Sequence, residues 1–257
     1  MKKSFLYLAS LTAVLASFTA CSDEFLNTTS KTESNTETFY KTEADAEMAL
    51  IGCYDGWQRT VSSGGPGIYL ASEMLSDQCF GGAGNGDGRN WQVLDRFDQA
   101  ESSSDVDIYD TDWANYYAAI YRCNELLAHQ DQIGWSDDAT KGRILGECRV
   151  IRALQYFDLS RLFGDVPLFT EPVNENRPRA AASEVFKVII EDLTYAAANI
   201  PATAYPVAGR NATDGRITKY AAEALLARVY LFYSGYYGVD PEGCTKAQAL
   251  AAVEDVI

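Results

Sequence analysis

Residues 146–169 read GECRVIRALQYFDLSRLFGDVPLF, and this stretch decides the fold. When the residues just before this stretch are included, one set of mostly apolar residues recurs at the 3.6-residue period of an α-helix and so forms one face. These residues are Ile144, Cys148, Ile151, Gln155, Leu159 and Leu162. A second apolar face consists of Val150, Ala153, Leu154 and Phe157. A helix with two apolar faces packs on two sides, which indicates layered helices. We therefore predict one helix from about Asp138 to Phe163, ended by Gly164 and by Pro167 beyond it.

Helical periodicity recurs along most of the chain. We predict further helices from about Thr42, across the stripe Trp113 to Leu127, from an N-cap at Ser183 to Pro201, and from Thr218. The last residues, TKAQALAAVEDVI, are also helical in pattern and carry no stop signal, so we expect the chain to be truncated at its C-terminus. No stretch alternates as strands do. The predicted fold is mainly α, with long irregular loops.

A weak internal repeat relates two of these helices. A shift of 74 positions places Ala153 on Ala227, Tyr156 on Tyr230, Ser160 on Ser234, Phe163 on Tyr237 and Gly164 on Gly238. The shift is near twice the ~34-residue tetratricopeptide period. A small residue followed three positions later by an aromatic ring suits interlocking helical pairs.

The N-terminus has the pattern of an export signal. Lys2 and Lys3 precede a mostly apolar run that is too short to span a membrane comfortably, and Cys21 follows two small residues. We predict a lipoprotein signal peptide at 1–20, lipidation of Cys21, a polar tether at 21–38 and a helical domain at 39–257. Phe18 stands where leucine is usual in such signals.

Composition excludes several functions. The net charge of −15 disfavours nucleic acid and anionic lipid surfaces as partners. The chain has no CxxC motif, and His129 is its single histidine, so the sequence predicts no metal site and no cysteine–histidine nucleophile. We interpret Cys123 and Cys148 as small core residues.

Five stretches together resemble the N-terminal portion of the SusD/RagB family of outer-membrane nutrient-binding lipoproteins. They are ACSDEFL (20–26), YYAAIYRCNELL (116–127), GECRVIRALQYFDLSRLFGDVPLF (146–169), RAAASEVFKVIIEDLTYAAANIP (179–201) and GRITKYAAEALLARVYLFYSGYY (215–237). They follow the family's order and cover most of the chain after residue 20.

The resemblance implies a SusD-like fold of tetratricopeptide-like helical pairs. It also implies a lipid-anchored protein on the outer face of the outer membrane that is not an enzyme. Such proteins act as the lid of a TonB-dependent transporter barrel and bind the incoming nutrient, usually an oligosaccharide and sometimes a peptide. Family members are much longer than this chain, and the remainder supplies much of the ligand-binding face.

A glycine-rich stretch, GGAGNGDGRNW (81–91), is the candidate ligand loop. Its glycines complete neither the dinucleotide nor the P-loop pattern, so a phosphate cradle is excluded. Sugars need an aromatic face and planar hydrogen-bonding groups, which Arg89, Asn90 and Trp91 supply, with Asp77 nearby. The resemblance places a glycan contact in this part of the chain. The alternative is a surface insertion in which Trp91 packs into the core.

Other residue groups carry weaker hypotheses. We expect structural roles for Glu147, Arg149, Arg152, Asp158 and Arg161, because buried charges need partners. Of these, Glu147 and Arg152 could pair with neighbouring helices or cap loops. The acidic run DVDIYDTD (105–112) lacks the EF-hand spacing, so Ca²⁺ is the weaker alternative to a solvated turn whose Asp112 caps the following helix. A helical glycoside hydrolase would need two carboxylates flanking one bond, and no such pair is identifiable. A tetratricopeptide scaffold for another protein leaves the lipid signal unexplained.

Overall fold

The structure is a computed structural model that describes residues 39–62, 67–82, 84, 86–87, 89–97, 109–202 and 215–257, with only the backbone at 89 and 90. Residues Tyr40–Ile257 form one compact unit. The described part is mainly helical, as predicted. It has no strand, and one isolated β-bridge joins Thr42 to Gly134. The predicted signal peptide, the tether and Cys21 lie outside the described residues.

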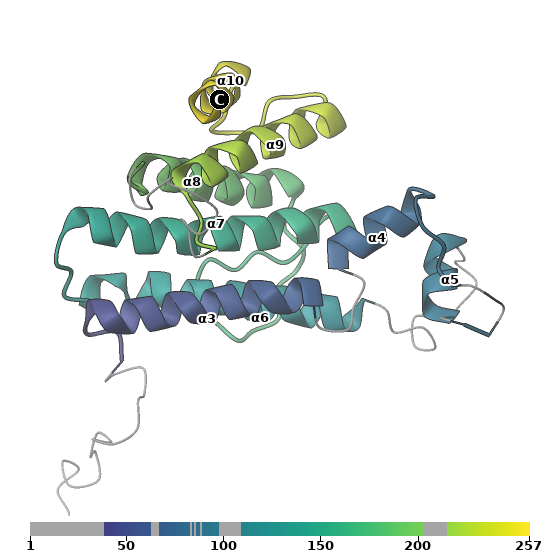
Figure 1. The fold of residues 1–257 in the computed structure, drawn as a ribbon, viewed down its shortest axis with the longest axis horizontal. Coiled ribbons are helices and arrows are strands. Elements are labelled where there is room, and N and C mark those ends of the chain that lie inside the picture. The colour runs from purple at the N-terminus through teal and green to yellow at the C-terminus, as the bar shows by residue number, and fades with distance from the viewer. Residues whose placement is uncertain are drawn as a thin grey trace, which may run out of the picture. The chain divides into compact units, whose positions relative to one another are not determined.

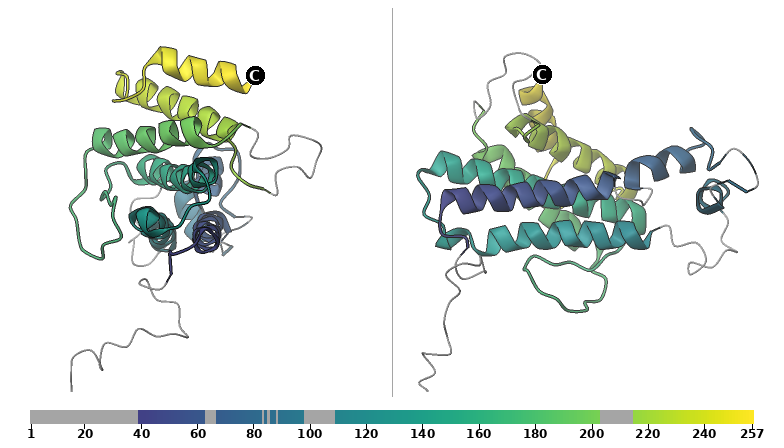
Figure 2. Two further views of the ribbon diagram at one scale, coloured as in Figure 1. Left: turned by 90° about the vertical axis from the view of Figure 1, so that its left-hand side faces the viewer. Right: turned by 60° about the horizontal axis from the view of Figure 1, so that its bottom comes forward.

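The helices of the described part follow one another in chain order. They are α3 (Glu43–Ser62), α4 (Gly67–Leu75), α5 (Arg89–Asp95), α6 (Asp110–Ala128), the 3₁₀ turn η2 (Gln130–Gln132), α7 (Asp138–Phe163), α8 (Ala182–Asn199), α9 (Lys219–Tyr237) and α10 (Lys246–Val256). Figure 1 shows the long helices stacked, with α3 and α6 below α7 and with α8, α9 and α10 above it. In the left view of Figure 2, α3, α6 and α7 are seen end-on and α8, α9 and α10 run across the view. Each layer packs on the next, which is the arrangement of tetratricopeptide-like pairs.

Helix α7 lies at the centre of the stack and has the predicted bounds. Asp137 caps it by accepting the Thr140 N–H at 2.7 Å. Both predicted faces are buried between α6 and α8, except at Leu154 and Leu162, which are half-buried. The contact with α8 is close: a Cβ at Gly142 would lie 2.5 Å from the carbonyl oxygen of Asn199. Glycine is therefore required there by the backbone of α8.

Buried charges join α7 to its neighbours. Arg152 donates to both carboxylate oxygens of Asp192 on α8, at 2.7 and 2.8 Å, and to Asn124 Oδ1 on α6 at 2.8 Å. Arg149 donates to the same Asp192 at 2.8 Å. Asp192 is only 1% exposed, so its charge is stabilised by these two arginines.

A second network surrounds Glu147, whose side chain is fully buried. Its carboxylate accepts hydrogen bonds from Arg143 at 3.0 Å and from the Tyr54 hydroxyl at 2.6 Å, and it pairs with Arg216 at 3.4 Å. Arg161 pairs with Asp158 within α7. The prediction that these α7 charges have structural partners is confirmed.

The weak repeat corresponds to similar helix ends in α7 and α9. Gly164 and Gly238 follow the two helices with φ of 73° and 72°, and their N–H groups donate to the carbonyls of Ser160 and Ser234 at 3.1 and 3.0 Å. Positive φ favours glycine at both positions. Tyr156 and Tyr230, which the 74-residue shift superimposes, are both buried.

Two predicted caps are wrong. Helix α8 begins after Ala181 rather than Ser183, and the Glu184 carboxylate accepts the Ala181 N–H at 3.1 Å instead. Asp112 does not cap its own helix, because its carboxylate accepts the N–H of Gly67 at 3.0 Å. It therefore stabilises the start of α4, a helix that sequence periodicity did not predict.

Candidate ligand-binding site

A pocket of about 650 Å³ lies between α6 and the segment 164–181 that follows α7. Helix α6 contributes Trp113, Tyr117 and Asn124, and the segment contributes Phe169 and Arg177. The complete lining is Trp113, Tyr117, Ala118, Ile120, Tyr121, Arg122, Asn124, Pro167, Phe169, Glu171, Val173, Asn174, Glu175, Asn176 and Arg177. The pocket is large enough for a small-molecule ligand.

Partly buried hydrogen bonds hold the wall of this pocket in place. The Tyr117 hydroxyl donates to the Pro167 carbonyl at 2.8 Å. Asn124 Nδ2 donates to the carbonyls of Phe169 and Glu171, at 3.0 and 3.2 Å. The Tyr156 hydroxyl exchanges hydrogen bonds with the backbone of Phe169, at 2.8 and 2.7 Å. The segment is therefore fixed on α6 and α7 although it has no regular secondary structure.

A row of aromatic contacts runs into the pocket. Ring centroids are 5.7 Å apart for Tyr109 and Phe163, 5.1 Å for Phe163 and Trp113, 4.9 Å for Trp113 and Tyr117, and 5.8 Å for Tyr117 and Phe169. Tyr109 also packs against the small cluster of Ala71 on α4 and Leu94 on α5. The row therefore joins the region of α4 and α5 to the pocket.

Polar groups lie around the aromatic wall. The Arg177 guanidinium lies over the Phe169 ring, 5.0 Å from its centroid, and donates to the Leu168 carbonyl at 3.2 Å. Asn174 and Asn176 are exposed at the rim. Half-buried rings beside amide and guanidinium groups provide the stacking surfaces and planar hydrogen bonders that a sugar ring needs.

Burial shifts the pKa values of several residues in and near the pocket. Burial raises the pKa of Tyr117, so its hydroxyl remains protonated and keeps its hydrogen bond to Pro167. Burial also raises the pKa of the carboxyls of Asp112, Asp158 and Glu223, and these three do not line the pocket.

A second hollow of about 750 Å³ shares Glu171 and Val173 with the first. Its charged lining includes Arg149, Arg152 and Asp192, which are already paired with one another. These groups hold α7 to α8, so the aromatic pocket is the better candidate for ligand binding.

The four residues predicted from the sequence lie outside the lining of the aromatic pocket. Asp77 is exposed after α4, with φ of 60°. Arg89 and Asn90 begin α5, and their side chains lie outside the described residues. Trp91 is half-buried in the first turn of α5. Whether these four residues touch a ligand stays a prediction.

The glycine-rich stretch has close backbone contacts. A Cβ at Gly81 would lie 2.3 Å from the Trp91 carbonyl oxygen, and one at Gly82 would lie 2.3 Å from the Asp87 carbonyl oxygen. Gln92 Nε2 closes the turn by donating to the carbonyls of Gly84 and Asp87, at 2.6 and 2.5 Å. Close packing of the backbone therefore requires glycine at positions 81 and 82, and the sequence pattern did not indicate this requirement.

Sequence reasoning missed the aromatic pocket for a physical reason. Trp113 and Tyr117 belong to the predicted stripe of α6, but they are half-buried, whereas Tyr116 and Ile120 are fully buried. The available signal was the long segment without periodicity between two strong helices, since such loops are often functional. The segment 164–181 folds back over α6, and a tertiary contact of this kind leaves no periodic signal in the sequence.

The acidic run 105–112 lies only partly within the described residues. Asp105 and Asp107 lie outside the described residues, so the Ca²⁺ alternative stays untested, while Asp112 binds the Gly67 N–H. Among the helices of the described residues, none combines the length and hydrophobicity that a membrane crossing requires.

Comparison with known proteins identifies relatives of the same fold. A SusD-like protein of Bacteroides ovatus is 29% identical over 245 residues, covering 91% of this chain and 40% of the relative. A SusD-like protein of Formosa agariphila is 30% identical over 201 residues, covering 76% of this chain and 37% of the relative. The structure of a laminarin-binding SusD-like protein is 27% identical and covers 84% of this chain and 44% of that one, with a TM-score of 0.65.

The chain thus spans about 40% of the length of the curated relatives it matches. The predicted fold and family are confirmed by the helical stack and by these matches together. A family model for SusD-like proteins, described as starch-binding and associating with the outer membrane, matches residues 24–231. This chain therefore belongs to the SusD-like family.

Proposed function

We propose that this chain is part of a cell-surface lipoprotein that binds an oligosaccharide and presents it to a TonB-dependent transporter barrel in the outer membrane. The observation that carries the proposal is the aromatic pocket on a SusD-like helical stack. The family description supports starch-type ligands and the outer membrane, and the similar laminarin-binding protein supports a glucan. The role is binding without catalysis.

The pocket would hold a sugar ring by stacking and by hydrogen bonds to paired hydroxyls. Trp113 offers a ring face, and the Arg177 guanidinium over the Phe169 ring offers a second planar surface. Asn174 and Asn176 offer planar donors and acceptors at the rim. Each polar contact replaces one with water, so the net gain is about 0.5–1.5 kcal/mol per hydrogen bond. We therefore expect modest affinity for one sugar and tighter binding for oligomers that reach several contacts.

The predicted loop would provide a second contact. The aromatic row leads from the pocket toward α4 and α5, which carry or adjoin Asp77, Arg89, Asn90 and Trp91. A linear glycan bound at Trp113 extends in the direction of this loop if it follows the row. This extension favours oligosaccharides over monosaccharides as ligands.

A binding screen of the purified protein tests the ligand class. Calorimetry against α-glucan, laminarin-type β-glucan and short peptides is expected to show binding of at least one oligosaccharide series, with affinity that increases with chain length. If the protein bound peptides and no oligosaccharide, the ligand would be a peptide rather than a glycan. Release of reducing sugar during the titration would contradict the non-catalytic role.

Two further measurements test the location and the partner. Labelling with palmitate should mark the wild-type protein and not the Cys21→Ala variant, because Cys21 is the proposed lipid site. Mild detergent extraction of the outer membrane should recover the full-length protein with a barrel-sized partner. Recovery of the protein alone under several detergents would contradict the transporter complex.

A further inference from the structure

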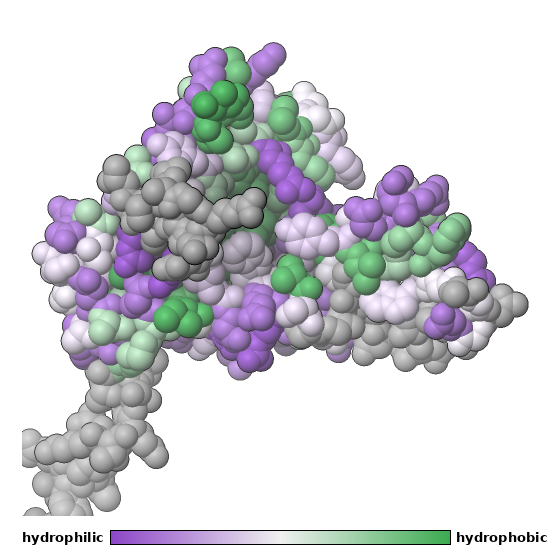
Figure 3. Space-filling view, viewed as in Figure 1, coloured by the Kyte–Doolittle hydropathy of each residue, from purple (hydrophilic) through white to green (hydrophobic). Residues whose placement is uncertain are grey.

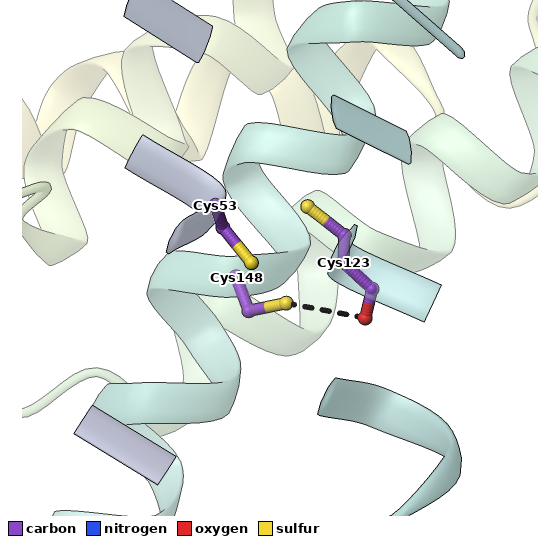
Figure 4. Close-up of side chains that lie close together, drawn as sticks. All are labelled: Cys53, Cys123 and Cys148. Atoms are coloured by element: carbon purple, nitrogen blue, oxygen red, sulfur yellow. Dashed lines mark hydrogen bonds between the residues drawn. The ribbon is translucent and has the colours of Figure 1, made fainter. Parts of the chain in front are cut away.

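Three cysteines from three helices meet in the core of the stack. Cys53 on α3, Cys123 on α6 and Cys148 on α7 each have no exposed surface, and their sulfur atoms all lie within 4.8 Å of one another. Figure 4 shows the three side chains grouped where the helices converge. All three are free thiols. They are far apart in the sequence, so no short motif indicates the cluster.

The spacing of the sulfur atoms suits one bound metal ion. An ion held by three thiolates at about 2.3 Å, as for zinc–sulfur bonds, sits in a triangle whose corners are about 4 Å apart. Sulfur atoms within 4.8 Å reach that geometry by inward shifts of no more than about 0.5 Å each. A χ1 adjustment of a cysteine side chain is enough for a shift of this size.

We propose that Cys53, Cys123 and Cys148 form a three-sulfur site for Cu(I). Zinc prefers four ligands, and among the described residues no fourth cysteine, histidine or carboxylate joins the group. Thiolate ligands also select Cu(I), and this soft ion is stable with three sulfur ligands. The three helices already hold the ligands together without the ion, so the site is preorganised.

Copper binding would change the charge of the cluster. Burial raises the pKa of Cys123 and Cys148, so these two are neutral thiols without metal. Without metal, the Cys148 thiol donates to the Cys123 carbonyl at 3.6 Å (Figure 4). Cu(I) would replace the thiol protons, which pass to solvent. Three thiolates and one Cu(I) carry a net charge of −2. The neighbouring cations are Arg122 and Arg152, which are also paired with Asp55 and Asp192.

The burial of the site determines how the ion enters. Because none of the three side chains is exposed, Cu(I) cannot reach the sulfurs without an opening of α3, α6 and α7. We therefore expect loading during folding, as in other structural metal sites, and a higher melting temperature of the loaded protein.

Anaerobic refolding of the full chain with Cu(I), supplied as its bicinchoninate complex, tests the proposal. A Cys21→Ser background removes the thiol outside the helical unit. We expect one copper per chain after desalting, and a tenfold or greater loss of retained copper in each of Cys53→Ser, Cys123→Ser and Cys148→Ser. Cys79→Ser and Cys244→Ser are matched controls that should retain the full amount.

X-ray absorption of the loaded wild-type protein is independent of whether the serine variants fold. Three sulfur neighbours around copper support the site, and two sulfur neighbours contradict it. Refolded helical protein that retains no copper would overturn the proposal. So would a disulfide between any two of the three cysteines in the protein as isolated. None of these outcomes bears on glycan binding, so the two proposals fail separately.

Discussion

The α7 core and the pocket rim are stabilised in different ways. Around α7, charged side chains such as Arg152 and Asp192 are buried and satisfied by one another. Around the pocket, Trp113 and Tyr117 are half-buried, and the segment that covers α6 is held by a few hydrogen bonds to its backbone. The difference indicates that the core sets the fold and that the rim is the part free to meet a ligand. Substitutions that perturb one region at a time therefore test this difference.

Removal of a core charge is expected to have the largest effect. Asp192→Ala leaves Arg152 and Arg149 without their buried carboxylate, and breaking such a network costs about 3–5 kcal/mol. Chemical denaturation followed by circular dichroism measures the loss. Glu242→Ala removes a carboxylate from an exposed pair with Lys187 and is the matched control. Equal effects of the two variants would contradict the distinction between core and surface.

A smaller core effect concerns the contact of α7 with α8. Gly142→Ala places a Cβ 2.5 Å from the Asn199 carbonyl oxygen, so the backbone must shift, at a cost of about 1–3 kcal/mol. The same change at Gly52 on α3 meets nothing within 4 Å and should stabilise the helix by about 0.5–1 kcal/mol. In thermal melts, we expect a lower melting temperature for Gly142→Ala and a higher one for Gly52→Ala than for the wild type. A stabilising Gly142→Ala would show that the α7–α8 contact is looser.

The pocket rim should respond more locally. Tyr117→Phe removes the hydrogen bond to the Pro167 carbonyl and should cost about 0.5–1.5 kcal/mol, because one bond is lost and the ring remains. Hydrogen exchange should accelerate in 164–181 and remain unchanged in α7. Uniform acceleration across the chain would mean that the segment is part of the cooperative core.

The smallest expected effect is a pH dependence at the junction of α4 and α6. Burial raises the pKa of Asp112 above its ordinary value of 3.8, so the folded state favours its protonated form. The stability from this group is therefore present at low pH and is lost as pH rises from 3.8 through the raised pKa. Asp112→Asn should remove this loss. The melting temperature of the variant relative to that of the wild type should therefore increase as pH rises across that window. If the melting temperatures of the variant and the wild type changed in parallel with pH, the raised pKa of Asp112 would be contradicted.

The sequence predicted the core better than the site. The bounds of α7 follow from its two apolar faces and from Gly164, because periodicity records which side of a helix is buried. The sequence predicted that the buried Arg152 needs a partner. It did not identify Asp192 as that partner, because the choice depends on how α8 packs against α7. The cap at Ser183 is wrong because Glu184 supplies the hydrogen bond.

The site depends on contacts that periodicity does not record. Tyr117 and Phe169 are brought together by a segment without regular structure, and the three cysteines by the convergence of three helices. The close approach of Gly81 to Trp91 is likewise a tertiary contact. Sequence patterns report burial along one element, whereas these features arise between elements.

Titration calorimetry of one oligosaccharide against the wild type and three variants tests the central claim most directly. With the best glucan from the screen, we expect Trp113→Ala to weaken binding by about tenfold or more, which is about 1.4 kcal/mol. Trp91→Ala should weaken it less, and Trp135→Ala, a control outside the pocket, should leave it unchanged. Circular dichroism must show that all three variants are folded. Unchanged affinity of a folded Trp113→Ala variant would contradict the account, because the ligand would then bind elsewhere.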